Sequence, residues 1–235
     1  MSKKTLLILG GIVVLLLAGS GYYYHASSVR SAAEAAANAA ASSASAATLP
    51  PDRVQPDDHV MGKADAPVVM VEYFAQACSV CARFDQDVFP KLKAKYIDTG
   101  KVRYVMRLLP IFPLDGPSYK LDLCLPPEKF YESADLLFRN QALWDAAEFP
   151  VSDPHGGLLQ MAKQLGIPAD KADACMNSTE HDAAINKVAQ EAVARYQPDG
   201  TPTLVIDFKK VDMPQKSWDE VQKALDAALA AKGVH

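Results

Sequence analysis

The chain has 235 residues, of which 49% are hydrophobic, so it is long enough for one folded domain with an insertion. Its net charge of −4 offers no basic surface to nucleic acid, and we expect no nucleic-acid partner. The 4 cysteines form an even count, which suits an oxidising compartment without proving one.

The first 25 residues are expected to anchor the chain in a membrane. The uncharged stretch 5–24 follows Lys3 and Lys4 and has about the length that one membrane-spanning helix needs. Three tyrosines close this stretch, as aromatic residues do at membrane interfaces, and the two lysines place the N-terminus in the cytoplasm. The alternative is a signal peptide cleaved after Ser20. Both interpretations export the rest of the chain.

Residues 26–56 are expected to form a disordered linker rich in alanine, serine and proline. Large apolar side chains are nearly absent, so the segment cannot form a core, although its alanines favour a lone helix in part. The folded domain is expected to start near Asp57.

A strand, a helix and a second strand follow in order. Residues 68–71 are an apolar run typical of a buried strand in a parallel sheet. Apolar residues then recur at helical spacing over residues 84–96, with a kink expected at Pro90 and an end at Gly100. Residues 102–109 predict the next strand, which completes a βαβ unit.

Residues 113–197 have a different, helical character. Glycine and proline pairs divide the segment into short pieces. Apolar residues recur at helical spacing in three of these pieces, residues 130–137, 158–165 and 183–196. We therefore expect a helical insertion over residues 113–197.

The pattern returns to strand at residues 201–208 and ends with an amphipathic helix at residues 218–232. Residues 57–112 and 198–235 are then the two parts of one α/β domain that the insertion interrupts.

Cys78 and Cys81 lie where the first strand leads into the helix. A thiol at a helix N-terminus faces unpaired N–H groups and the positive end of the helix dipole, which favours the reactive thiolate. The alternative is half of a zinc site, but zinc needs a second CxxC or an HxxxH, and the sequence has neither. The domain has three histidines that fall into no metal-ligand spacing and are expected on the surface: His59, His155 and His181. We predict redox chemistry without a metal or cofactor.

Glu72 stands six residues before Cys78 in an otherwise apolar strand. A buried carboxylate is unfavourable without a partner or a role, and burial raises its pKa. Glu72 could then take and return the proton of Cys81. The alternative is that strand alternation points Glu72 outward.

Cys124 and Cys175 both lie in the helical insertion. A disulfide between them would close a loop of about 50 residues and contribute roughly 4 kcal/mol in the chain-entropy model. The alternative is a pair of buried free thiols. In an exported domain we expect a structural disulfide.

Several segments together resemble the DsbA-like thiol–disulfide oxidoreductases of the thioredoxin superfamily. These segments are residues 62–67, 72–74, 78–81 and 200–203. The similarity covers residues 57–232 and implies a thioredoxin-like fold with an inserted helical domain. It also implies that Cys78 is the exposed nucleophile, that Cys81 resolves the mixed disulfide and that Pro202 packs beside them in cis.

A cis bond before Pro202 would leave the backbone of Thr201 free to pair with an extended substrate. An ordinary trans proline at a strand start is the alternative. Ser79 and Val80 are expected to contact the substrate, and residues 74–77 are expected to line a shallow groove.

Two departures from the family leave the direction of electron flow open. Strongly oxidising members carry Pro-His in place of Ser79-Val80, and that histidine helps the thiolate. Thr201 before the proline also occurs in isomerase-type and reductase-type relatives. Stabilisation of the Cys78 thiolate is then expected mainly from the helix N-terminus.

The resemblance implies cysteine-containing exported proteins as substrates, on the periplasmic side of the inner membrane. The domain would be tethered there, or soluble in the periplasm if the N-terminus is cleaved. An oxidase would need a DsbB-like membrane partner, whereas an isomerase or reductase would need a reductant from across the membrane. From a different class, a redox-inert binding or assembly factor of the envelope is the alternative.

Overall fold

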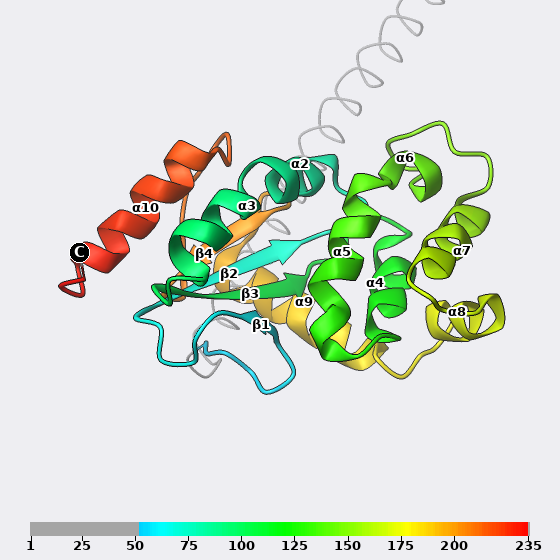
Figure 1. Cartoon of the computed structure of the whole chain (residues 1–235), viewed down its shortest axis with the longest axis horizontal. Coiled ribbons are helices and arrows are strands. Elements are labelled where there is room, and N and C mark those ends of the chain that lie inside the picture. The colour runs from blue at the N-terminus through cyan, green and yellow to red at the C-terminus, as the bar shows by residue number, and fades with distance from the viewer. Residues whose placement is uncertain (1–51, 235) are drawn as a thin grey trace, which may run out of the picture. The chain divides into compact units, whose positions relative to one another are not determined.

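A computed structural model describes residues 52–234, so the expected anchor and most of the expected linker lie outside the described residues. One sheet has the strand order β1-β3-β2-β4-β5 (Figure 1). Its strands are β1 His59–Met61, β2 Val68–Phe74, β3 Val102–Leu108, β4 Thr203–Ile206 and β5 Lys209–Lys210. The β2–β3 pair is parallel, as predicted for the βαβ unit, and the other neighbouring pairs are antiparallel. Within residues 52–234, no helix is both long enough and apolar enough to cross a membrane.

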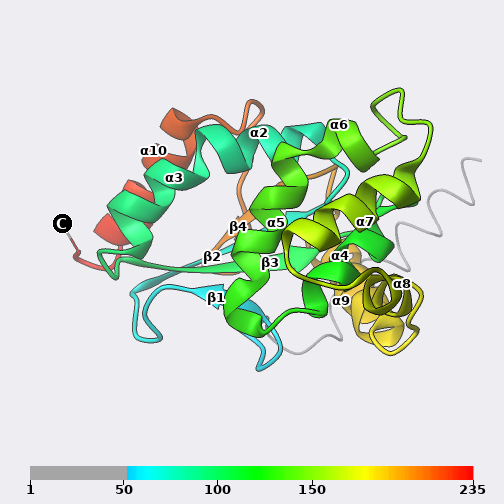
Figure 2. The ribbon, with the colours of Figure 1, turned by 45° about the vertical axis from the view of Figure 1, so that its right-hand side comes forward.

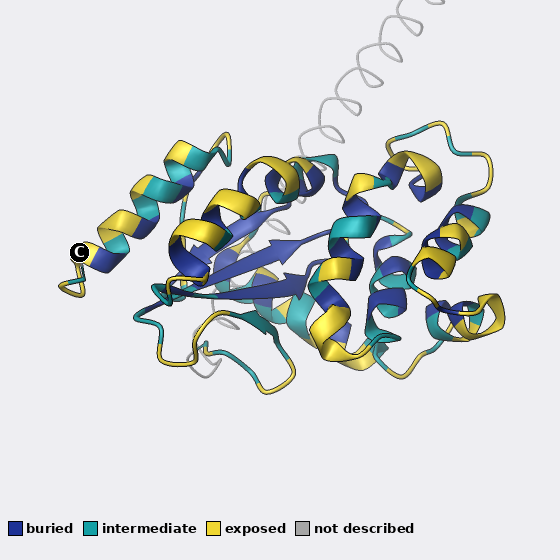
Figure 3. Cartoon of the chain, in the orientation of Figure 1, coloured by how far each residue is buried: buried dark blue, intermediate teal, exposed yellow. Residues whose placement is uncertain are grey.

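Helices cover both faces of the sheet, and its three inner strands, β3, β2 and β4, are almost entirely buried (Figure 3). The helices α2 Ser79–Asp87, α3 Phe89–Leu92 and α10 Trp218–Ala230 pack on one face, where β2 contributes Met70 and Phe74. Helix α9 Asp182–Tyr196 packs on the other face, against Val71 and Tyr73. Because side chains alternate along a strand, Glu72 lies on the same face as α2.

The helix expected over residues 84–96 is divided into three pieces. Helix α2 ends at Asp87, α3 follows as Phe89–Leu92, and a π-helix, η1, continues as Lys93–Ile97. Pro90 lies in the first turn of α3, where its missing N–H is not needed. The proline therefore starts a new helix and does not kink a continuous one.

The segment between β3 and α9 is helical, as predicted. Its elements are α4 Asp115–Leu123, η2 Pro127–Lys129, α5 Phe130–Arg139, α6 Gln141–Trp144, α7 Pro154–Gln164 and α8 Ala169–Met176. We call α4 to α8 the helical layer (Figure 2). Its core is built around the fully buried Trp144, with Leu121, Leu137 and Met161. Helix α9 lies within the expected insertion but packs on the sheet.

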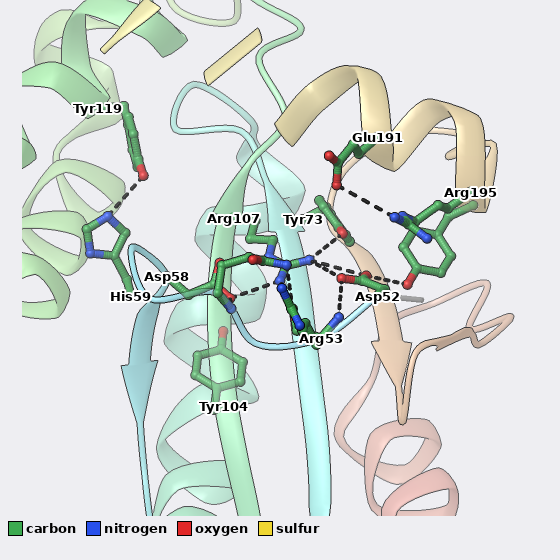
Figure 4. A network of polar contacts seen from close by, with 12 residues as sticks. Asp52, Arg53, Asp58, His59, Tyr73, Tyr104, Arg107, Tyr119, Glu191 and Arg195 are labelled. Atoms are coloured by element: carbon green, nitrogen blue, oxygen red, sulfur yellow. Dashed lines mark hydrogen bonds and ion pairs between the residues drawn. The ribbon is translucent and has the colours of Figure 1, made fainter. Parts of the chain in front are cut away.

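Residues 52–58 run across the α9 side of the sheet, and we call them the N-terminal strap. Arg107 of β3 binds Asp52 and Asp58 of this strap through its guanidinium group (Figure 4). The boundary expected near residue 57 therefore falls inside a packed segment. The surface position expected for His59 is wrong, because its ring stacks on Phe130 at 3.5 Å and burial lowers its pKa to about 4.

Candidate active site

Cys78 and Cys81 lie at the N-terminal end of α2, directly after the turn that follows β2. Cys78 is the N-cap residue, and Cys81 stands in the first turn of the helix; both are free thiols. Cys78 is only 5% exposed and Cys81 is fully buried. Cys78 is thus less exposed than expected, because the backbone of Thr201 lies against its sulfur atom. Within residues 52–234, no group of three or more His, Cys, Asp or Glu side chains is placed to hold a metal ion.

Cys78 is the more acidic of the two thiols. Its pKa is lowered to about 6, and the largest cause is a hydrogen bond from the Cys81 thiol. Burial acts in the opposite direction, while Thr201 and the backbone N–H groups of Cys81 and Val80 lower the pKa further. The helix N-terminus contributes as expected, but it comes after the neighbouring thiol. A donor inside the CxxC therefore contributes most to the stabilisation of this thiolate, in a protein that carries no histidine between the two cysteines.

Glu72 is buried beside the thiols, at 2% exposure. Burial raises its pKa to about 8, although a hydrogen bond from the Tyr104 hydroxyl acts in the opposite direction. The pKa of Cys81 is raised well above its ordinary value, first by burial, then by its hydrogen bond to Cys78, and also by the charges of Cys78 and Glu72. The carboxyl group therefore lies within electrostatic reach of both thiols.

Asp85 is a further acidic group that sequence analysis missed. It lies one helical turn after Cys81 on α2, and its Oδ2 atom is buried without a hydrogen-bond partner among the described residues. Burial raises its pKa, and so do a hydrogen bond and the charge of Asp135 on α5. Its position four residues after Cys81 was the signal in the sequence, since residues i and i+4 share one helix face.

The loop before β4 brings Thr201 and Pro202 to the thiols. The Thr201–Pro202 peptide bond is cis. The Cys78 thiol donates a hydrogen bond to the carbonyl oxygen of Thr201 at 3.4 Å. Ser79 and Val80 are the first residues of α2 and are half-buried. The structure therefore gathers Glu72, both cysteines and this loop, which are up to 130 residues apart in sequence (72 to 202).

Residues 74–77 do not line a groove. All four are fully buried, so that expectation is wrong. Their turn is covered because Ala77 packs in the core of the helical layer and Gln76 donates a hydrogen bond to the carbonyl of Ala134 in α5. Two further side chains that sequence analysis missed, Asp115 and Gln141, also bind this turn.

Cys124 and Cys175 lie apart from this site, in the helical layer. A disulfide joins them across a sequence separation of 51 residues, with their Cα atoms 6.1 Å apart. It ties the C-terminal end of α4 to α8, two helices that pack together.

Comparisons with known proteins agree with this geometry. The thioredoxin family model matches residues 54–227. A Rickettsia prowazekii protein named for protein-disulfide oxidoreductase activity is 32% identical over 180 residues, which cover 75% of this chain and 63% of that protein. This chain therefore spans less than two thirds of that relative's length.

Solved structures of similar fold include DsbA proteins. Wolbachia pipientis alpha-DsbA1 superposes with a TM-score of 0.65 and 25% identity, over 78% of this chain and 94% of that one. Oxidised BdbD from Bacillus subtilis shares the fold with a TM-score of 0.63 and 23% identity, over 74% of this chain and 93% of that one. The family match and these similarities together place the chain in the thioredoxin family, among its DsbA-like members.

Proposed function

We propose that this protein is a thiol–disulfide oxidoreductase that forms or exchanges disulfides through Cys78 and Cys81. The observation that carries the proposal is the opposite behaviour of the two thiols. The pKa of Cys78 is lowered to about 6, whereas that of Cys81 is raised well above its ordinary value. Near neutral pH one sulfur is a thiolate and good leaving group, and the other holds its proton.

In the oxidising direction, a substrate thiolate attacks the Cys78 sulfur of the Cys78–Cys81 disulfide. The bond between the two cysteines breaks, and Cys81 leaves with the electron pair. A second substrate thiolate then attacks the substrate sulfur of the mixed disulfide, and Cys78 leaves as a stabilised thiolate. The substrate gains a disulfide and the enzyme is reduced by two electrons. In the reverse direction Cys78 attacks a substrate disulfide and Cys81 resolves it.

Glu72 supplies and accepts the proton of Cys81. With a pKa of about 8, its carboxyl group holds a proton near neutral pH and can give it to Cys81 as that sulfur leaves. In the reverse direction the carboxylate removes the same proton before Cys81 attacks. Tyr104 holds the carboxyl group in place through its hydroxyl.

Thr201 and Pro202 would hold the extended substrate beside Cys78, with Ser79 and Val80 as neighbouring contacts. Support comes from the hydrogen bond between Cys78 and the Thr201 carbonyl, which places the loop before β4 against the sulfur.

The reduction potential should fall between those of thioredoxin and DsbA. A thiol pKa of about 6 lies between roughly 7 for thioredoxin and roughly 3.5 for DsbA. A less stabilised thiolate means a less stable reduced form, so we expect a potential between about −270 and −120 mV. Equilibration of the Cys78–Cys81 pair with glutathione measures it, and a value at or above −120 mV, about that of DsbA, would contradict the argument.

Trapping of mixed disulfides tests the assignment of the two cysteines. Cys81→Ala should accumulate mixed disulfides with cysteine-containing exported proteins, because nothing resolves them. Cys78→Ala should accumulate few, because Cys81 is fully buried. The wild-type protein should catalyse insulin reduction in the presence of a thiol reductant. A wild-type protein inactive in that assay would instead support a redox-inert envelope binding factor.

We further propose that the domain acts outside the cytoplasm, tethered to the periplasmic side of the inner membrane by residues 1–25. A DsbB-like membrane protein would accept the electrons if the enzyme is an oxidase. Support comes from the uncharged stretch 5–24 after Lys3 and Lys4. The full chain expressed in a bacterium should remain with membranes after a carbonate wash, whereas a soluble product starting near Gly21 would show signal cleavage.

A further inference from the structure

The turn that presents Cys78 is held by a carboxylate of the helical layer. Asp115, the first residue of α4, is fully buried. Its Oδ1 atom accepts a hydrogen bond from the N–H of Ala77 at 2.8 Å. Its Oδ2 atom accepts from the N–H groups of Ile111 and Phe112, each at 2.7 Å. One carboxylate therefore joins the residue before the nucleophile to the loop after β3.

A side-chain amide of the same layer binds the carbonyl groups of the residues before and after Ala77. Gln141 is the first residue of α6 and is 3% exposed. Its Nε2 atom donates to the carbonyl of Gln76 at 2.9 Å and to the carbonyl of Cys78 at 3.1 Å. Helices α5 and α6 lie beside the N-terminal end of α2 (Figure 2).

We propose that Asp115 and Gln141 are positioning residues for disulfide exchange. They fix the backbone of Gln76, Ala77 and Cys78, and thereby aim the Cys78 sulfur at the donors that stabilise its thiolate. Within residues 52–234, their hydrogen bonds go to backbone groups and none reaches a sulfur atom, so they act through the backbone. The inference rests on the proposed function and assigns to the helical layer a direct part in setting the reactivity of Cys78.

The physical reason is that the stability of the thiolate depends on where the Cys78 sulfur lies relative to its hydrogen-bond donors. The Cys81 thiol and the N–H groups at the start of α2 lower the pKa of Cys78 only where the sulfur meets them at hydrogen-bonding distance and angle. Cys78 is the N-cap residue: its carbonyl accepts the first helical hydrogen bond from the N–H of Ala82 at 3.0 Å, and its own N–H donates to the carbonyl of Ala75 at 3.2 Å. Asp115 and Gln141 add three hydrogen bonds to two peptide groups, Gln76–Ala77 and Cys78–Ser79, and so restrain this turn from outside the helix.

Gln141→Met tests the inference without changing the charge. The substitution keeps the length of the side chain and removes both N–H donors. We expect the Cys78 thiol to become about tenfold less acidic. The displaced sulfur would lose about one of the hydrogen bonds that stabilise its thiolate, and a hydrogen bond to a charged group is worth at least that factor. The exchange constant with glutathione should shift about tenfold, or about 30 mV toward a more reducing potential. Thiolate absorbance against pH and glutathione equilibration measure the two quantities.

Asn140→Leu is the matched control. Asn140 precedes Gln141, and its amide also donates to a backbone carbonyl, that of Leu136 within the helical layer. Its removal should lower stability without moving the acidity of Cys78. An equal shift in both variants would show that any weakening of the layer disturbs the thiol, and would overturn the inference.

Asp115→Asn gives a second, independent test through the sign of the effect. Removing a negative charge near Cys78 would by itself make the thiol more acidic. Loss of positioning makes it less acidic, and this is the result we expect. The control is Asp122→Asn, on the same helix and 1% exposed, whose carboxylate binds Ser133 and not the turn. It should leave the acidity of Cys78 unchanged.

The outcomes separate this inference from the proposed function. Near-ultraviolet circular dichroism of each variant shows whether it folds. If one of Gln141→Met and Asp115→Asn fails to fold, the other variant alone tests the inference. A wild-type protein without a reversible dithiol–disulfide couple would overturn the proposed function. A wild-type protein that exchanges disulfides, with folded variants whose Cys78 acidity is unchanged, would overturn only the positioning role.

Discussion

Burial acts to raise the pKa of Cys78, Cys81 and Glu72 alike, yet near neutral pH only Cys78 has lost its proton. Hydrogen bonding explains the difference. Cys78 receives hydrogen bonds from the Cys81 thiol and the helix N-terminus, which together outweigh burial. Glu72 receives one from Tyr104, and burial outweighs it. At the scale of single residues, the donors aimed at the Cys78 sulfur are what separate its protonation state from those of its two buried neighbours.

The raised pKa of Glu72 predicts how stability depends on pH. Its value of about 8 in the folded protein exceeds the ordinary 4.5, so the folded state holds a proton that the unfolded chain releases. This contribution to stability is present below pH 4.5 and is lost as pH rises through 8. Glu72→Gln keeps a neutral side chain, so its free energy of unfolding should decline less across that range. Denaturant titrations of the reduced protein at several pH values measure this.

Glu72→Gln should also slow the resolution of mixed disulfides near neutral pH, because no group then takes the proton of Cys81. Asp85→Asn is the control, since Asp85 also has a raised pKa but bonds to Asp135. A resolution rate that Glu72→Gln leaves unchanged across pH, or that Asp85→Asn lowers equally, would remove the proton role of Glu72.

At the scale of elements, the parts of the site that follow from local pattern could be predicted. The CxxC lies between an apolar run and a helical repeat, and the structure has β2 and α2 there. The side chains that bind the backbone of that turn could not be predicted, because Asp115 stands 38 residues after Ala77 and Gln141 stands 65 residues after Gln76. Nothing in the local sequence of α4 or α6 indicates which backbone groups they reach. The burial of Cys78 was missed for the same reason, since Thr201 comes from a distant loop.

The disulfide between α4 and α8 predicts a loss of stability when it is removed. Replacing both cysteines, Cys124→Ala with Cys175→Ala, should lower the free energy of unfolding by about 2–4 kcal/mol, because the closed loop spans 51 residues. Chemical denaturation of the oxidised proteins measures it. The acidity of Cys78 should stay unchanged, because the bridge is attached at the C-terminal end of α4, opposite the end that carries Asp115. Two free thiols at these positions in oxidised, denatured wild-type protein would contradict the assignment.

At the scale of the whole described segment, one arginine joins the N-terminal strap to the sheet. Arg107 donates to Asp58 from Nε at 2.8 Å and from Nη2 at 2.9 Å, and from Nη1 to Asp52 at 3.1 Å (Figure 4). It also donates to the hydroxyl of Tyr73 and the carbonyl of Arg53. The arginine side chain is 6% exposed and each aspartate side chain 5%, so water screens these ion pairs little. The strap is thus bound by charge, although its sequence resembles the end of a linker.

Arg107→Met should destabilise the domain strongly. The side chain keeps a similar apolar volume, but Asp52 and Asp58 are left buried without their cation, and breaking a buried pair in this way costs about 3–5 kcal/mol. Denaturant unfolding measures the loss. Arg103→Met, on the same strand but half-exposed, is the control and should have a smaller effect. Adding Asp52→Asn and Asp58→Asn to Arg107→Met removes the two unpaired charges and should restore part of the stability. A loss below about 1 kcal/mol for Arg107→Met, in the range of surface ion pairs, would show that the strap is held by its apolar contacts instead.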